Sequence, residues 1–111
     1  MTQNISVLGL TITATGTITA RRFCTYAGAQ AGAAANTVGV ARFAATTGQP
    51  VAVDVIGTAQ VEAGAAITAG ALIETDAQGR AITRSAGPIV GRALQAASGA
   101  GAFIEVLLIV N

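Results

Sequence analysis

The chain has 111 residues, of which 52% are apolar and only 10% are charged, and its formal net charge is +1. This length allows one domain. Beyond the Arg21-Arg22 pair, no stretch gathers the basic residues that nucleic-acid binding requires. No apolar run approaches the roughly 20 residues of a membrane span. We therefore expect neither nucleic acid nor a membrane as a partner.

The first 20 residues have the pattern of an edge strand. Over residues 5–19, apolar and small residues share one side and five threonines share the other. This alternation favours a strand, because β-branched side chains suit a pleated sheet. Gly16 indicates a bulge or a bend. We interpret residues 1–20 as an arm that is continuous with a β-domain at 21–111 and that adds a strand to a neighbouring molecule.

Further short strands follow, with turn residues between them. They are expected at 21–26, 38–45, 51–56, 58–62, 72–75, 80–84, 89–94 and 102–110. Residues 27–36 are expected to form a loop, because two glycines interrupt the alanine run. About eight or nine short strands of this kind are typical of an all-β barrel or sandwich. We predict a single all-β domain with little or no helix and no internal repeat.

A hairpin around Asp76-Ala77-Gln78-Gly79 is the most distinctive local signal. Gly79 supplies the positive φ that a tight turn requires, and the Asp76 side chain is suited to bond the turn backbone. Glu74 and Asp76 share strand parity. One interpretation is a carboxylate pair that performs acid–base catalysis or binds calcium. The other is a solvated hairpin tip. We favour the solvated tip.

Several residue types that carry chemistry are missing. The chain has no histidine, which is the commonest general base and metal ligand. It also has no lysine, and therefore no Schiff-base or biotinyl-lysine chemistry. Cys24 is the single cysteine, so no intramolecular disulfide forms, and we expect this side chain to be buried. We predict that the protein is not an enzyme and binds no cofactor or metal.

The apolar content is largely alanine, with three Phe, one Tyr and no Trp. Val, Ile, Leu and Phe must therefore supply most of the hydrophobic stabilisation. A core this lean gains stability from oligomerisation. The low charge fits either a polar, uncharged surface or a surface that a partner covers, and the sequence leaves both open.

From about residue 51 to residue 110, the order of elements resembles that of a family of small tailed-phage virion proteins, the capsid cement or head decoration proteins. The first half of the chain fits the same plan more loosely. The resemblance rests on Ile56-Gly57-Thr58-Ala59, Ile67-Thr68-Ala69-Gly70-Ala71-Leu72-Ile73, Asp76-Ala77-Gln78-Gly79-Arg80-Ala81, Ile89-Val90-Gly91-Arg92-Ala93-Leu94 and Ile104-Glu105-Val106-Leu107-Leu108.

The resemblance implies a small β-barrel or sandwich that binds the outer capsid surface and bridges major capsid protein subunits. It implies a homo-oligomer, most often a trimer, located on the virion and assembled in the host cytoplasm. As interface candidates we name Arg21, Arg22, Tyr26, Glu74, Asp76 and Arg80.

Three alternatives remain open. A phage fibre or host-surface module would need an aromatic groove for sugars. A small-ligand barrel would need a large apolar cavity. An enzyme would need Glu74 and Asp76 to converge with Arg80 in a cleft.

Overall fold

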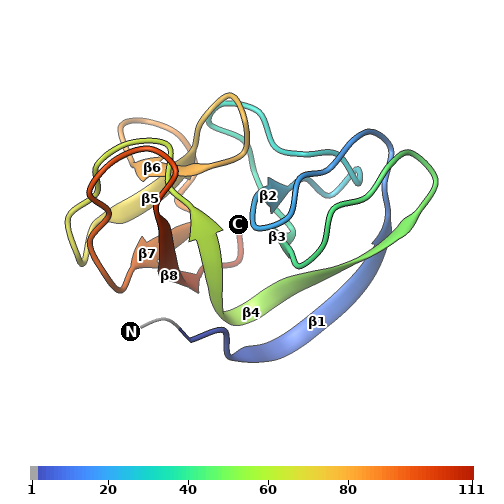
Figure 1. The fold of residues 1–111 in the computed structure, drawn as a ribbon, viewed down its shortest axis with the longest axis horizontal. Coiled ribbons are helices and arrows are strands. Elements are labelled where there is room, and N and C mark those ends of the chain that lie inside the picture. Colours follow the sequence, from blue (N-terminus) through green and yellow to red (C-terminus); the bar gives the residue numbers. More distant parts are fainter. Residues whose placement is uncertain (1–2) are drawn as a thin grey trace.

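The computed structural model describes residues 3–111, which form eight strands and no helix (Figure 1). No helix able to cross a membrane occurs in this range. The all-β, single-domain prediction is confirmed. Met1 and Thr2, the beginning of the expected arm, lie outside the described residues. The strands are β1 (Ser6–Thr13), β2 (Phe23–Cys24), β3 (Gly39–Ala41), β4 (Pro50–Glu62), β5 (Leu72–Thr75), β6 (Ala81–Thr83), β7 (Gly91–Ala93) and β8 (Phe103–Leu108).

All eight strands belong to one sheet, in the order β2-β3-β4-β8-β7-β5-β6, with β1 paired to β4 outside this path. The sheet curls into a nearly closed barrel. Its two ends approach each other where the Phe23 N–H donates to the Gly79 carbonyl over 2.9 Å. The molecule has two adjoining lobes: one contains β1, β2, β3 and the beginning of β4, and the other contains the end of β4 with β5 to β8 (Figure 1). Loops that join the short strands lie on the outside of these lobes.

Most strands lie where the alternation predicted them, but they are shorter. The strands expected at 51–56 and 58–62 are one strand, β4, which bends at Gly57 with a φ of 115°. The chain bends at Gly16, just after β1, in agreement with the bulge or bend expected there. A separate irregularity of β1 lies between Ser6 and Gly9. The five threonines from Thr11 to Thr19 are exposed, as the alternation indicated.

The pairing plan of the strands occurs twice. We call residues 9–56 the first half and residues 58–108 the second half. In the first half, β1 pairs with the beginning of β4, which pairs with β3, which pairs with β2. In the second half, the end of β4 pairs with β8, which pairs with β7, which pairs with β5. These four strands of each half therefore match one another, and β4 belongs to both halves. β6, which pairs with β5, is an additional strand of the second half.

The loops repeat the same plan. Ile18 and Ala45 exchange two backbone hydrogen bonds of 2.8 and 3.0 Å. Ile67 and Ala97 exchange two bonds of 3.0 and 2.9 Å at the matching place of the second half. These paired bonds tie together the loops that connect the strands in each half.

The positive φ angles also recur in pairs. Arg21 has a φ of 65° and Gly70 a φ of 88°, and Gly48 and Gly101 have φ angles of 87° and 90°. The N–H groups of Arg21 and Gly70 donate over 2.8 Å to matching carbonyls, those of Ala41 and Ala93. The expectation of no internal repeat is therefore wrong. Some matching positions hold the same residue, such as Ile18 and Ile67 or Ala45 and Ala97, but these are common apolar types set among unlike neighbours, and the alternation pattern does not separate them.

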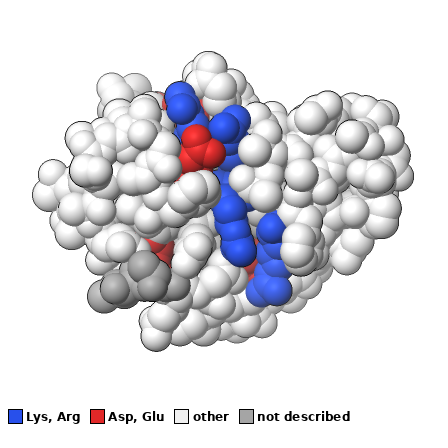
Figure 2. Space-filling view, in the orientation of Figure 1, with Lys and Arg blue, Asp and Glu red and all other residues white. Residues whose placement is uncertain are grey.

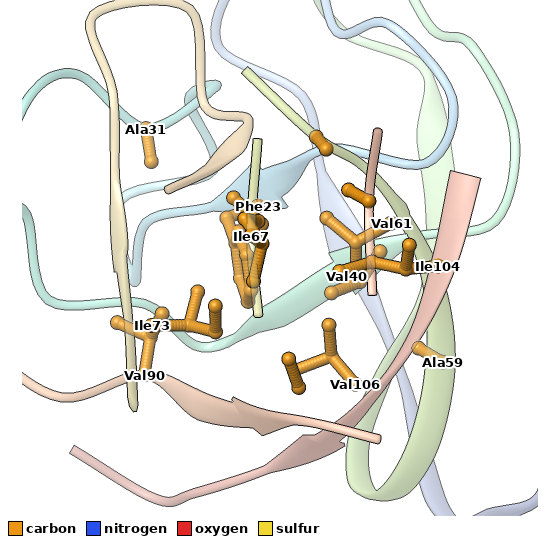
Figure 3. Packing of buried hydrophobic residues seen from close by; sticks show 14 residues of the cluster. Phe23, Ala31, Val40, Ala59, Val61, Ile67, Ile73, Val90, Ile104 and Val106 are labelled. Atoms are coloured by element: carbon orange, nitrogen blue, oxygen red, sulfur yellow. The ribbon is translucent and has the colours of Figure 1, made fainter. Parts of the chain in front are cut away.

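Each half has its own group of buried side chains. The first-half cluster is built on residues such as Ile18, Val51 and Val53. The larger cluster fills the second half but also contains Phe23 and Val40 from the first, so it joins the two halves. In Figure 3, Phe23 stands in the middle of the labelled side chains.

The core differs from the expected one in its large residues. Phe23 is fully buried, but Phe43 and Phe103 are 64% and 53% exposed. No leucine is among the buried residues of the described range; the core is mostly Val, Ile and Ala. Cys24 is buried, as predicted, and this burial raises the pKa of its thiol to about 11.

Candidate interaction surface

Four arginines line up between the two lobes, and we call them the arginine row: Arg80, Arg22, Arg21 and Arg42. Figure 2 shows the band of positive side chains that crosses this face. The carboxylates that hold the row in place are Asp54 and Glu62, both on β4, and Asp76 in the hairpin turn.

One end of the arginine row is a four-residue network. Arg22 contacts both carboxylate oxygens of Glu62, through Nε and Nη2, at 3.2–3.3 Å. Arg80 Nε donates to Asp76 Oδ2 over 2.8 Å and its Nη1 lies 4.0 Å from Glu62 Oε2. The side chains are 13–24% exposed. Partly exposed ion pairs of this kind contribute up to about 1 kcal/mol each, so they position the arginines more than they stabilise the fold.

The other end of the row rests on Asp54, which is 1% exposed. Arg42 Nε donates to Asp54 Oδ1 over 2.8 Å, and Asn4 Nδ2 donates to Asp54 Oδ2 over 3.1 Å. Arg21 Nη1 in turn donates to Asn4 Oδ1 over 3.1 Å. Asn4 therefore connects the two arginines through the carboxylate between them.

Asp76 performs the turn role that the sequence predicted. Its Oδ1 accepts the backbone N–H groups of Gln78 and Arg80 over 2.9 and 2.8 Å, and Gly79 has a φ of 74°. Asp76 and Glu74 do not form a joint site, because each carboxylate binds a different segment of backbone.

Glu74 is buried, so the expectation that it forms a solvated tip is wrong. Its Oε1 accepts the backbone N–H of Ser85, and those of Ala86 and Gly87 over 3.1 and 3.2 Å. These contacts, the one with Ser85 first, lower the pKa of the Glu74 carboxyl. Glu74 thus fixes the loop between β6 and β7.

Tyr26 lies apart from the arginine row. Its ring is 60% exposed, and its hydroxyl donates to the Asn111 carbonyl over 2.7 Å. Asn111 Oδ1 also accepts the Thr37 N–H over 2.7 Å. Of the six interface candidates, the structure therefore brings Arg21, Arg22, Asp76 and Arg80 together and separates Tyr26 and Glu74 from them.

Four residues of this surface were missed by the sequence interpretation: Asn4, Arg42, Asp54 and Glu62. Asp54 and Glu62 had a usable signal, since both are acids within an otherwise apolar or neutral strand, which indicates a paired charge. Asn4 had none, because its role depends on the N-terminal segment folding back across β4.

The negative charges of the surface are turned inward. Asp54, Glu74 and Glu105 are buried, and the side chains of Glu62 and Asp76 are only 16% and 13% exposed. In contrast, the Arg42 side chain is 40% exposed, and Arg84 and Arg92 are exposed. The clearest difference in exposure is at the Arg42 end of the row, because Arg22 and Arg80 are only slightly more exposed than the carboxylates with which they pair.

A hollow of about 330 Å³ adjoins the Arg42 end of the row. Its wall includes Gly9 and Thr11 of β1, Ala52 and Asp54 of β4, and Arg42. In residues 3–111, no group of three His, Cys, Asp or Glu side chains is placed to hold a metal ion. The wall of the hollow thus combines the Arg42–Asp54 ion pair with small and apolar residues of β1 and β4.

Comparisons with known proteins give a family and a fold. A family model described as phage cement protein matches residues 2–108. No curated protein matches the chain. Among solved structures, the crystal structure of the head fiber gp8.5 N base in bacteriophage phi29 is similar with a TM-score of 0.77. It is 20% identical, and the alignment covers 92% of this chain and 93% of that chain. This likeness shows a shared fold.

Proposed function

Because the chain belongs to the phage cement protein family, we propose that it binds the outer surface of a phage capsid and bridges neighbouring major capsid protein subunits. We propose that it acts as a homotrimer on a virion that is assembled in the host cytoplasm. Many copies on a regular shell turn a modest free energy per contact into a large total.

The observation that carries this proposal is the distribution of charge. Arg42, whose side chain is 40% exposed above the buried Asp54, together with the exposed Arg84 and Arg92, fits a partner surface with acidic groups, because complementary potentials favour association and like charges oppose it. Arginine is also enriched at binding hot spots, and phenylalanine is one of the aromatic residues enriched at interfaces. Phe103 is 53% exposed and lies opposite Glu62, the partner of Arg22, in the sheet.

The first test is co-sedimentation of the protein with phage heads before and after expansion. We expect binding to expanded heads that weakens as salt is raised, since salt screens exposed charges. Heads with bound protein should also withstand a higher temperature before they come apart. A protein that sediments with neither head form contradicts the proposal.

The second test separates the arginine row from charge in general. The double variant Arg42→Gln/Asp54→Asn removes an ion pair as a unit, so the net charge stays the same and no lone carboxylate stays buried. The control Arg84→Gln removes one exposed positive charge away from the row. We expect the double variant to bind heads about tenfold more weakly, in the range of a hot-spot residue, and the control to bind nearly as well as the wild type. The opposite order would mean that the row is not the contact.

A further inference from the structure

The outer edge of β1 is open. Within residues 3–111, β1 pairs with no strand other than β4, and none of its residues is buried. Val7, Leu8 and Leu10 are 74%, 40% and 44% exposed. Natural edge strands are usually protected by charges, proline or bulges. The first 20 residues contain no charged side chain or proline, and the irregularity of β1 ends at Gly9. The regular part of β1 beyond Gly9 is therefore open to pairing with a further strand.

The internal repeat supplies a covered version of the same edge. The counterpart of β1 in the second half is the end of β4, where Thr58 matches Gly9 and Gln60 matches Thr11. There the Thr58 N–H donates to the Ile5 carbonyl over 2.8 Å. The Gln60 N–H donates to Asn4 Oδ1 over 3.2 Å. Asn4 and Ile5, which precede β1, therefore cover the edge of the second half.

The hollow beside Arg42 is the matching seat in the first half. Ala52, in its wall, corresponds to Glu105, since these residues lie opposite Thr11 and Gln60. In the second half this seat is filled, because the Gln3 N–H donates to Glu105 Oε1 over 3.3 Å. In the first half the same position is an open hollow of about 330 Å³.

The polar groups of the open edge point toward the vacant side. Neighbouring residues in an antiparallel strand direct their N–H groups to opposite sides. The Ala52 carbonyl accepts the Arg42 N–H over 2.9 Å, on the β3 side of β4. The backbone polar groups of Val53, the next residue, therefore point to β1, where they face those of Leu10. Thr11 follows Leu10, so its N–H points away from β4.

We propose that the open edge of β1, with the adjoining hollow, binds an extended segment of a second copy of this chain, which supplies carbonyl or amide acceptors to the Thr11 N–H. The second copy is favoured because the covered version of this edge is bound by a segment of this same chain. The absence of charge before Arg21 also removes any like-charge penalty between copies. The inference rests on the proposed function only in that it locates the oligomer contact of that function.

The test compares two valines of similar exposure. Val7→Lys places a charge on the open edge, whereas Val110→Lys places one on a residue that is 69% exposed near the other end of the chain. By sedimentation equilibrium we expect an oligomeric wild type, a Val7→Lys variant whose dissociation constant rises about tenfold or more, and an unchanged Val110→Lys variant. A monomeric wild type, or equal effects of the two substitutions, overturns the inference.

A second variant removes the donor itself. Thr11→Pro deletes the outward N–H and leaves the ladder with β4 intact, since proline is tolerated on the free side of an edge strand. We expect it to weaken self-association about tenfold with an unchanged far-UV spectrum, and the wild-type Thr11 amide to be protected from hydrogen exchange only in the oligomer. An unprotected amide overturns the proposal.

Head binding measured on the same variants keeps the two proposals distinguishable. A monomeric Val7→Lys variant that still sediments with expanded heads supports both. If the wild type is monomeric in solution and Val7→Lys abolishes head binding, the edge serves the capsid rather than a second copy. That result overturns this inference and leaves the proposed function standing.

Discussion

Gly39 is the position where β3 comes closest to β4, and it gives the sharpest stability prediction. A Cβ at this position would lie 2.1 Å from the Asp54 carbonyl oxygen and 2.9 Å from the Asp54 carbonyl carbon. Ordinary contact begins at 3.4 Å, so Gly39→Ala needs the two strands to separate by about 1.3 Å. Both obstacles are backbone atoms, so no side-chain rotation relieves them.

The magnitude follows from two contributions. Overpacking of a tight core costs about 1–3 kcal/mol, and each weakened ladder hydrogen bond adds about 1 kcal/mol. We expect Gly39→Ala to lower the free energy of unfolding by about 3 kcal/mol, a large share of the 5–15 kcal/mol typical of a domain. With a urea m-value of about 1–3 kcal/mol/M, the unfolding midpoint should fall by roughly 1–2 M.

The internal repeat provides graded controls for the same experiment. Gly91 is the counterpart of Gly39, but there the nearest atom is the Val106 Cγ1 at 2.5 Å, which can move, and the Leu107 carbonyl oxygen is at 2.8 Å. Gly91→Ala should therefore cost less, about 1–2 kcal/mol. Gly16→Ala meets nothing within 4 Å and should stabilise by about 0.4–1 kcal/mol. Equal midpoints for Gly39→Ala and Gly16→Ala would refute the reasoning.

Three further predictions concern buried contacts. Because the pKa of Glu74 is lowered in the folded state, its contribution to the free energy of unfolding is fully present above its unfolded pKa near 4.5 and is lost as pH falls through the folded pKa. In urea titrations, Glu74→Gln should thus be less stable than the wild type at pH 7, and the difference in stability should close in acid. A difference that stays constant with pH would contradict this. The Cys24 thiol, with a pKa of about 11, should react with a thiol reagent at pH 8 only as fast as the protein unfolds, so rapid labelling of the native protein would be evidence against its burial. Asn111→Ala removes the acceptor of the Thr37 N–H and should speed hydrogen exchange of that amide by about tenfold, for a hydrogen bond worth about 1–1.5 kcal/mol; an unchanged rate would show that another group protects it.

The sequence predicted the fold class because strand alternation and turn chemistry are local signals. The turn at Asp76 and Gly79 is an example, since the hydrogen bonds of the Asp76 side chain that shape it lie within five residues. Strand ends were less predictable, because pairing with a distant strand decides where the ladder stops. The strand expected at 21–26 stops after Cys24, where the chain leaves β3.

The candidate surface was only partly predictable. The arginines were visible, but the carboxylates that group them come from β4, up to 40 residues away in the chain. The burial of Glu74 could not be predicted for the same reason, since its hydrogen-bond partners are backbone N–H groups of a loop 11–13 residues later in the chain. The repeat was missed because the residues that it shares, such as Ile18 with Ile67, are common apolar types, whereas the shared φ angles and hydrogen bonds appear only in the structure.

The sharing of β4 by both halves has a mechanical consequence. Its first residues pair with β1 and β3, and its last residues pair with β8, with only the bend at Gly57 between. A force that pulls one lobe away from the other must therefore act along β4 and shear its hydrogen bonds with β1, β3 and β8. It cannot simply separate two packed surfaces. On a shell under internal pressure, tension entering one lobe would reach the other along covalent bonds.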